Sequence, residues 1–311
     1  MSDWTLRSVA FKFQLSDWTL FSVTLPMQVR VEGLASAGAP VERLDPPPVL
    51  AGAGCQGYSI RNLPIAQELP VLSVVGNYLC YVPLQYPHCY IDLTWSFDQY
   101  VGKFSSKSRS TIQRKIRKFK EHCGGELRWK TYSAPEDLPE YFELARSVSR
   151  LTYQERLLDA GLPDSDAFAR QSAELAAQGH LRAYILFDGG RPVSYLYCPI
   201  EDGALIYAYL GYDPEYQGLS VGTILQWLAL EQIFAEGKFR YFDFTEGLSS
   251  HKQLFATHQR LCANVFFVKR TLANALLLRA HFMTDQFSKW LGRTLDRVGL
   301  KSKIKKLLRR G

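Results

Sequence analysis

Two carboxylates near the end of one apolar stretch have side chains suited to acid–base chemistry. Asp243 lies within FRYFDFTEG, and Glu246 follows three positions later. Burying a carboxylate in an apolar strand is costly unless the group is paired. Asp243 is therefore either a structural residue bonded to a neighbouring backbone group or lysine, or an acid–base or orienting group, and Glu246 is the alternative base. His251, farther along, is either a general acid or base or a surface residue.

A run of small residues, in GYDPEYQGLSVGTIL, has the composition of an anion-binding turn. The first N–H groups of a helix are unpaired and carry a partial positive charge, and glycines let an anion approach the backbone closely. The same composition is also typical of a simple capped turn. Ser220 could cap the helix and offer its hydroxyl to an anion, or it could block close approach. The candidate site is Gln217, Gly218, Leu219, Ser220, Val221, Gly222 and Thr223.

The elements that would position these residues follow one another closely. Compact turns separate three predicted strands, which we therefore expect to be antiparallel, at 181–188, 191–200 and 203–212. Two helices are predicted before them, at 139–160 and 164–178. After them we expect a helix at 220–236, a strand at 238–246, a short helix at 251–255 and a strand at 263–270, followed by helix to the end.

The first third of the chain is predicted to be mainly β-structure with one basic helix. SDWTL occurs at Ser2–Leu6 and at Ser16–Leu20, and both copies lead into strands that we expect to be neighbours. Residues 33–57 are predicted to be a loop, and two strands should flank Gly76–Asn77. A helix is expected from about Ser96. Ser106–His122 should form another helix, either a solvated helix on the sheet or one that gathers substrate phosphates.

Charge is distributed unevenly along the 311 residues. Lys103–Lys120 holds eight Lys or Arg and no acid, and Lys289–Arg310 holds nine and one acid. The remaining 20 basic and 29 acidic residues give the rest of the chain a charge of −9, although the whole is +7. This pattern predicts anionic partners at two places rather than general nucleic-acid binding. Six scattered cysteines without a CxxC pair favour reduced thiols and argue against a zinc site.

The order of elements around Ala183–Leu210 resembles the core of the GNAT acyltransferase superfamily. GNAT proteins have Q/R-x-x-G-x-G/A at the turn, and this chain has Gln217, Ser220 and Gly222 at the three motif positions. Ser220 departs from the usual glycine. A Ser-x-Gly turn is common in a subgroup found in bacterial envelope and polysaccharide loci, related to Fem-type aminoacyl transferases and cellulose-locus acetyltransferases.

This subgroup resemblance extends from about Tyr90 to Lys269. It rests on KSRSTIQRKIR at 107–117, LGYDP at 210–214, Ser220–Gly222, Asp243-Phe, and HKQLF at 251–255. The resemblance implies an α/β fold with a mixed sheet, in which a degenerate N-terminal GNAT-like half precedes a complete C-terminal one. We expect the domains to be 1–122 with the basic helix, 123–270 as the acyltransferase domain, and 271–311 as a C-terminal helix and basic amphipathic tail.

The resemblance also implies roles for individual residues. Residues 217–223 would hold the pyrophosphate of acetyl-CoA or another acyl-CoA. The strand at 203–212 would splay from its neighbour at 239–246, and backbone groups of Ala208–Leu210, including Leu210, would bind the pantetheine arm. Lys252 would lie near the donor phosphates or the developing oxyanion. Transfer would be direct, with neither a covalent nucleophile nor a metal.

Three classes of function remain open from the sequence. The first is an N- or O-acyltransferase that uses an acyl-CoA or an acyl-carrier protein and a small amine, amino acid or sugar acceptor. The second is a Fem-like transferase that uses aminoacyl-tRNA, favoured slightly by the basic helix, although nucleic acid is not the expected partner. The third is a non-catalytic GNAT-shaped binding module. The acceptor pocket would lie within Tyr141–Gln178, which carries Arg146, Arg150, Tyr153, Glu155 and Arg156.

The C-terminal segment 289–310 is basic and amphipathic. It either lies on an anionic membrane surface or forms a terminal helix with a solvated face. The N-terminus has no basic region followed by an apolar run, so we expect no signal peptide. The expected location is cytoplasmic, with peripheral attachment to the inner membrane if the tail binds lipid.

Overall fold

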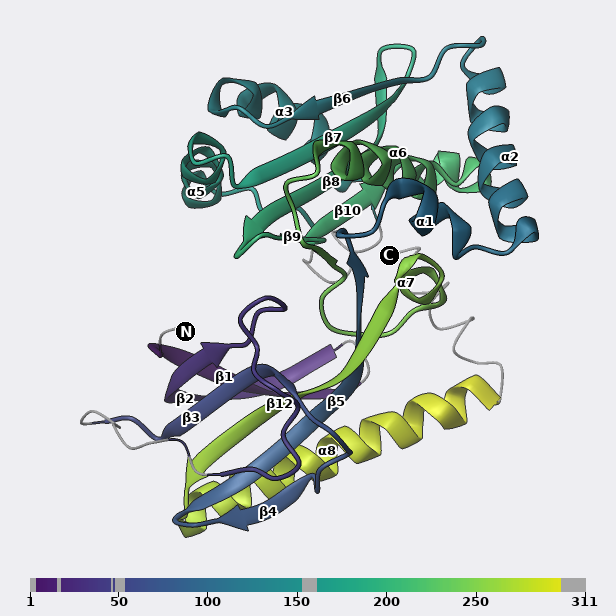
Figure 1. The fold of residues 1–311 in the computed structure, drawn as a ribbon. Coiled ribbons are helices and arrows are strands. Elements are labelled where there is room, and N and C mark those ends of the chain that lie inside the picture. Colours follow the sequence, from purple (N-terminus) through teal and green to yellow (C-terminus); the bar gives the residue numbers. More distant parts are fainter. Residues whose placement is uncertain (1–3, 16–17, 46, 48–53, 153–160, 298–311) are drawn as a thin grey trace. The chain divides into compact units, whose positions relative to one another are not determined.

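A computed structural model describes residues 4–15, 18–45, 47, 54–152 and 161–297 (Figure 1). The chain divides into two compact units. Unit 1 comprises residues 1–32, 37–85 and 261–311, and unit 2 comprises residues 33–36 and 86–260. Strands β5 (Tyr78–Asp92) and β12 (His258–Lys269) each begin in one unit and end in the other.

Unit 1 is a sheet covered by one long helix. Its other strands are β1 (Thr5–Leu15), β2 (Trp18–Val31), β3 (Gly57–Pro64) and β4 (Leu72–Val75), and its helix is α8 (Leu272–Arg297). The strand order is β1-β2-β3-β12-β5, with β4 paired to β5. Strands β1 and β2 are antiparallel neighbours, as predicted from the repeated SDWTL segments. Helix α8 packs against β1, where Leu278 is buried among Val9, Phe11 and Val29.

Unit 2 is a mixed sheet with helices on both faces. Its order is β5-β11-β9-β8-β7-β6, and β10 pairs with β8. Its strands are β6 (Arg128–Tyr132), β7 (Leu181–Asp188), β8 (Arg191–Glu201), β9 (Ala204–Ile206), β10 (Tyr209–Tyr212) and β11 (Tyr241–Asp243). Its helices are α1 (Phe97–Gly102), α2 (Ser106–His122), α3 (Leu138–Ser149), α5 (Asp166–Ala177), α6 (Val221–Glu236) and α7 (Ser250–Phe255), with 3-10 turns η1 (Pro135–Asp137) and η2 (Pro214–Leu219).

Alternating residues of the sheet in unit 2 form two separate cores. Tyr184 and Leu186 of β7 pack in one core with α1, α2, α6 and α7, whereas Ala183 and Ile185 pack in the other with α3 and α5. This alternation is the two-residue period of a strand with both faces covered. Helix α6 is apolar nearly all round, which suits its position within the first core.

The predicted strand at 203–212 is divided where the sheet opens. β9 pairs in parallel with β11, from Ala204 opposite Tyr241 to Ile206 opposite Asp243. After Ile206 the chain leaves β11, and the only partner of β10 among the described strands is β8. The Tyr207 N–H donates to the Asp243 carbonyl at 2.8 Å, which is the last link before the two strands separate. The structure thus has the splay that the sequence resemblance implied, and Asp243 lies at its origin.

Several predicted boundaries shift by a few residues. The helix predicted at 139–160 ends at Ser149, and residues 153–160 lie outside the described ranges. The strand predicted at 238–246 contains only Tyr241–Asp243 in regular pairing. Strand β5 joins the predicted strand after Asn77 to the YIDL segment in one run. The two compact units are defined by the contacts within each of them and do not test the predicted domain boundaries after residues 122 and 270. Those boundaries stay a prediction.

Candidate active site

The turn before α6 is held by a buried aspartate and a left-handed serine. The Oδ1 atom of Asp213 accepts a hydrogen bond from the Glu215 N–H at 3.0 Å, and its Oδ2 atom accepts one from Arg191. Ser220 adopts φ +58°, which turns the chain from η2 into α6. Its hydroxyl does not cap the helix, so Ser220 contributes a backbone conformation rather than the side-chain cap considered from the sequence.

A pocket of about 270 Å³ opens at the N-terminus of α6. Six of the predicted donor-binding residues line it: Leu210, Gln217, Ser220, Val221, Gly222 and Thr223. Tyr207, Tyr212 and His251 complete the lining, whereas the predicted residues Gly218 and Leu219 are absent from it. A Cβ atom at Gly222 would lie 3.2 Å from Leu210 Cδ2 and 3.3 Å from Tyr212 Cδ1. The pocket wall therefore fits closely around this glycine.

Asp243 pairs with a buried histidine, His88. Its Oδ1 atom bonds to His88 Nε2 and also accepts the Thr245 N–H at 2.6 Å. Both side chains are almost fully buried, His88 in β5 and Asp243 at the end of β11. Oδ2 of Asp243 has no hydrogen-bond partner among the described residues. One carboxylate oxygen is thus fixed, and the other remains able to accept a proton.

The sequence signal for this pair was two polar residues in apolar strands. His88 lies in β5 one residue before Cys89, and β5 is paired with β11 through Tyr90 and Asp243. A buried carboxylate requires a partner, and a histidine in a neighbouring buried strand is able to supply one. Sequence spacing alone does not reveal which strands are neighbours, so the pairing could not be assigned.

The structure brings Lys252 and Glu246 to the same place as Asp243. Lys252 Nζ donates to the Glu246 carbonyl at 2.7 Å. Burial lowers the pKa of Lys252, while Cys89, Asp243 and Glu246 act electrostatically in the opposite direction. Burial also raises the pKa of Cys89, which favours the thiol over a nucleophilic thiolate. Glu246 is exposed, so its carboxylate lies nearer the solvent than that of Asp243.

His251 lies on the pocket side of α7 and is oriented by α6. Its Nε2 is 2.6 Å from Gln226 Oε1, so the Gln226 amide fixes the orientation of the imidazole. Burial, followed by the charges of Lys115 and Lys252, lowers the pKa of His251. A neutral imidazole lining the pocket favours the acid–base alternative for this residue. Neither Gln226 nor Lys115 was singled out from the sequence.

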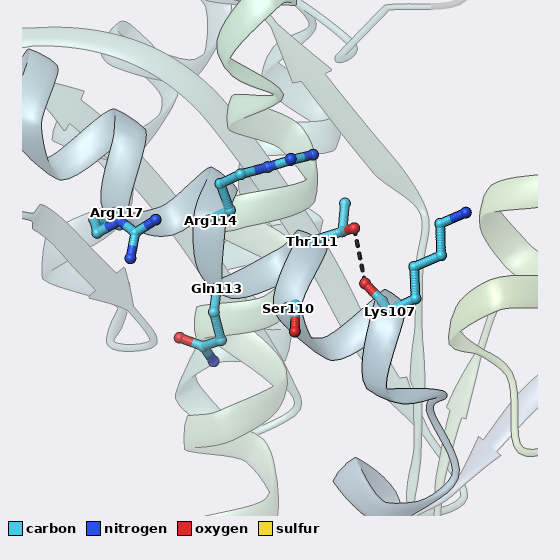
Figure 2. Close-up of a pocket in the computed structure, with 6 residues that line it drawn as sticks. All are labelled: Lys107, Ser110, Thr111, Gln113, Arg114 and Arg117. Atoms are coloured by element: carbon cyan, nitrogen blue, oxygen red, sulfur yellow. Dashed lines mark hydrogen bonds between the residues drawn. The ribbon is translucent and has the colours of Figure 1, made fainter.

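Helix α2 lies beside this pocket and carries basic residues on its exposed sides. Ile112 and Phe119 are buried, and the residues lining a shallow hollow on another side are Lys107, Ser110, Thr111, Gln113, Arg114 and Arg117. Figure 2 shows Lys107, Thr111 and Arg114 projecting from one side of the helix, with Ser110 and Gln113 on another. Since Lys115 acts electrostatically on His251, this helix borders the α6 pocket. Helix α2 also packs against α6 and η2.

The region expected to bind the acceptor is only partly described. Arg146 and Arg150 both pair with Asp164, at 2.9 and 3.2 Å. The predicted candidates Tyr153, Glu155 and Arg156 lie outside the described residues, as does the tail from residue 298. Within the described ranges, no group of three or more His, Cys, Asp or Glu side chains is arranged to hold a metal. Among the described helices, none combines the length and hydrophobicity that crossing a bilayer requires.

Known proteins resemble parts of this chain. Residues 106–253, just under half of the chain, match the acetyltransferase (GNAT) domain family. FemX is similar in structure, with 9% identity and a TM-score of 0.50 over 89% of this chain and 90% of FemX. L-PGS from Bacillus licheniformis aligns at 14% identity and a TM-score of 0.46, covering 73% of this chain and 72% of that protein. None of the curated proteins matches the sequence.

The domain match begins with α2 and ends within α7. It therefore includes the splayed strands, the α6 pocket, Asp243, Glu246 and Lys252. The FemX similarity, which shows the fold alone, extends over most of both units and confirms the predicted mixed α/β class. The chain thus has a GNAT-like mixed α/β fold, and its residues 106–253 are similar to the acetyltransferase (GNAT) domain family.

Proposed function

We propose that this protein moves an aminoacyl group from aminoacyl-tRNA directly to an amine or hydroxyl acceptor. The observation that carries the proposal is the basic face of α2 beside the pocket at the N-terminus of α6. This donor is the one implied for Fem-type transferases by the sequence resemblance. The FemX-like fold supports the choice without establishing it.

The extent of the basic face favours a long polyanion over a small cofactor. Helix α2 has 17 residues, which at about 1.5 Å per residue corresponds to roughly 26 Å. Lys107, Arg114 and Lys118 lie at helical spacing on one exposed side, and Glu121 is the single acid in the helix. A nucleic-acid backbone repeats its negative charge along its length and can contact all of these residues. Coenzyme A concentrates its phosphates at one end.

The geometry at Asp243 suits removal of a proton from the acceptor. Oδ1 is held by His88 and the Thr245 N–H, so the carboxylate has a fixed orientation. The acceptor N–H or O–H would donate to Oδ2 as its heavy atom attacks the acyl carbonyl carbon. The new bond to carbon forms as the ester bond to the tRNA ribose breaks, and the ribose oxygen leaves with a proton from an acid.

Lys252 is placed to stabilise the charges of this step. Its ammonium group lies within electrostatic reach of Asp243. A positive charge there would stabilise the negative charge that develops on the carbonyl oxygen. A lowered pKa also makes an ammonium group a better proton donor, so Lys252 is our candidate for protonating the leaving oxygen.

An acyl-CoA-dependent acyltransferase is the second candidate. The observation that favours it is the compact α6 pocket, whose lining includes six of the residues expected to bind a CoA pyrophosphate. The splay between β10 and β11 would accept a pantetheine arm as the resemblance implies. This candidate does not require the basic face of α2.

The experiment that tests the proposal compares the two donors directly. Binding of aminoacyl-tRNA, deacylated tRNA and acetyl-CoA would be measured for the full chain at several salt concentrations. We expect the tightest binding for aminoacyl-tRNA, and the Lys107→Ala/Arg114→Ala variant should weaken it about tenfold and reduce the salt slope. Lys120→Ala is the matched control because this exposed lysine lies on another side of α2.

Two outcomes would reject the proposal. Equal binding of aminoacyl-tRNA, deacylated tRNA and an unrelated polyanion would show charge attraction without donor recognition. Binding of acetyl-CoA that raises the unfolding temperature, without detectable binding of aminoacyl-tRNA, would establish the second candidate instead.

A further inference from the structure

Helix α8 carries an apolar stripe that is exposed to solvent. Its members are Leu272, Leu276, Met283, Phe287 and Trp290, each at least half exposed, from 51% for Phe287 to 79% for Leu272. At about 100° per residue, these five positions fall within roughly 60° of the helix circumference. Large apolar residues on a protein surface are normally scattered singly, whereas several on one side of a helix, here with Arg279 between Leu276 and Met283, indicate an interaction site.

The stripe is separate from the face that α8 uses for packing. Leu278 and Asn274 are buried on the inner side, and Phe282 packs with the core against β1. His281, also on the inner side, bonds through Nδ1 to the Tyr81 hydroxyl at 2.7 Å. The inner contacts therefore fix the rotation of α8 and hold the stripe outward. From Leu272 to Trp290 it extends over about 27 Å of helix.

The charge of the following sequence identifies the chemistry of the partner. Lys289–Arg310 contains nine Lys or Arg and one acid. Phe287 and Trp290 lie in the last described turns of α8 with their rings stacked at 5.7 Å, and Lys289, between them in the sequence, pairs with Asp285 at 2.7 Å. Apolar and aromatic side chains beside a cluster of positive charge are the combination that binds an anionic lipid surface.

We propose that the exposed stripe of α8 attaches the protein to the surface of an anionic membrane. The apolar stripe would lie among the acyl chains near the headgroups, with Trp290 at the interface and the lysines and arginines on the anionic headgroups. The attachment is peripheral, because α8 packs on its own sheet through Leu278 and Phe282. This inference rests on unit 1 and does not depend on which acyl donor unit 2 uses.

A second copy of the chain is a poorer occupant of the stripe. A symmetric contact that pairs two α8 helices in parallel would bring their basic C-terminal ends toward each other. Like charges at close range oppose such a contact, most strongly at low salt. An anionic lipid surface neutralises the same charges.

Flotation of the full chain with vesicles tests the proposal. Vesicles of phosphatidylcholine alone would be compared with an equal mixture of phosphatidylcholine and phosphatidylglycerol. We expect binding to the mixture only, weakened by salt, and the Phe287→Ser/Trp290→Ser variant should lower the partition coefficient about tenfold or more. Both substitutions lie on the exposed side and leave the inner contacts intact.

The matched control removes exposed apolar side chains from another part of the same unit. Val31→Ser/Val74→Ser changes two residues that are 47% and 52% exposed and lie on β2 and β4. This control should bind vesicles as well as the unaltered chain. The proposal is overturned if the unaltered chain does not float with anionic vesicles, or if the α8 variant floats equally well. It is also overturned if sedimentation shows a dimer of the unaltered chain that the α8 variant converts to a monomer.

Discussion

At the scale of single residues, the main feature is the mutual dependence of His88 and Asp243. Each is a polar side chain that an apolar core would otherwise disfavour, and each supplies the partner that the other needs. The pair supports a structural role for Asp243, because its Oδ1 atom bonds to both His88 and the Thr245 N–H. Oδ2 keeps the catalytic interpretation open, since a base needs one oxygen that is held and one that can accept a proton.

Asp243→Asn is the substitution that separates these two interpretations. An amide at this position keeps the shape of the side chain but accepts a proton poorly. We expect turnover to fall by about 100-fold or more, which is the usual contribution of a general base. Donor affinity should change little, because the α6 pocket is formed by other residues. Single-turnover kinetics combined with donor titration would measure the two quantities.

Glu246→Gln is the control for that experiment. Glu246 was the alternative base from the sequence, and its side chain is exposed. Its replacement should leave the rate within a few-fold of the unaltered enzyme. The assignment is reversed if Glu246→Gln loses turnover while Asp243→Asn retains it.

At the scale of elements, much of unit 2 could be predicted because its turns are explicit in the sequence. Asp188-Gly189-Gly190 and Glu201-Asp202-Gly203 mark the ends of strands, and the hairpins they imply are present. The stripe of Ile112, Ile116 and Phe119 similarly places α2 with its apolar side inward. These signals are local, so a single sequence is sufficient to interpret them.

The features that could not be predicted from the sequence depend on contacts between segments that are far apart in the chain. The resemblance implied a splay, but not its position after Ile206, where β9 pairs with β11 while β10 turns to β8 alone. Nothing in IYAYLGY indicates which neighbour each residue will have. The pairing of His88 with Asp243 and the contact of Gln226 with His251 join residues 155 and 25 positions apart. Side-chain roles in the site therefore required the tertiary structure.

Gly211→Ala tests the close approach of β10 to β8. Gly211 is paired with Tyr195, and a Cβ atom at Gly211 would lie 2.3 Å from the Tyr195 ring. Tyr195 is buried and bonded to Ser149, so the ring has little room to move. We expect the free energy of unfolding to fall by about 1–3 kcal/mol, as in other overpacked cores. Urea denaturation of the purified variant measures this change.

Gly218→Ala is the corresponding control. Nothing lies within 4 Å of a Cβ atom built at Gly218. Its free energy of unfolding should stay within about 0.5 kcal/mol of the unaltered protein. If Gly211→Ala proves as stable as Gly218→Ala, the splay does not require a glycine at this point of β10.

At the scale of the whole molecule, the two basic segments belong to different units. Helix α2 lies in unit 2 with the candidate active site, and the segment after α8 continues from unit 1. An acidic body with two separate basic elements is therefore consistent with two anionic partners, as the charge distribution predicted. Because the proposed partners bind different units, substitutions in α2 and α8 should affect donor binding and vesicle binding independently.

The two units also share one dependence on pH, through the half-buried histidines His251 and His281. Burial, with Lys115 and Lys252, lowers the pKa of His251 in unit 2 from its ordinary 6.5. Burial lowers the pKa of His281 in unit 1, against the opposing effects of Asp285 and of the hydrogen bond to the Lys12 backbone. Below pH 6.5 the unfolded chain binds protons at these histidines that the folded chain does not. Their contribution to stability is therefore complete above that pH, and it is lost as the pH falls through the lowered folded-state values.

We accordingly expect the free energy of unfolding to decrease between about pH 7 and pH 5, by up to roughly 1.4 kcal/mol per pH unit for each proton taken up. Asp188 and Glu140, whose pKa values are lowered from 3.8 and 4.5, should contribute mainly at lower pH. Urea denaturation across this range would give the slope, and His251→Gln and His281→Gln should each reduce it. The comparison uses slopes rather than absolute stabilities because both substitutions also alter a hydrogen bond, to Gln226 in one case and Tyr81 in the other. An unchanged slope in the double variant would show that the two imidazoles take up protons as readily in the folded chain as in the unfolded one.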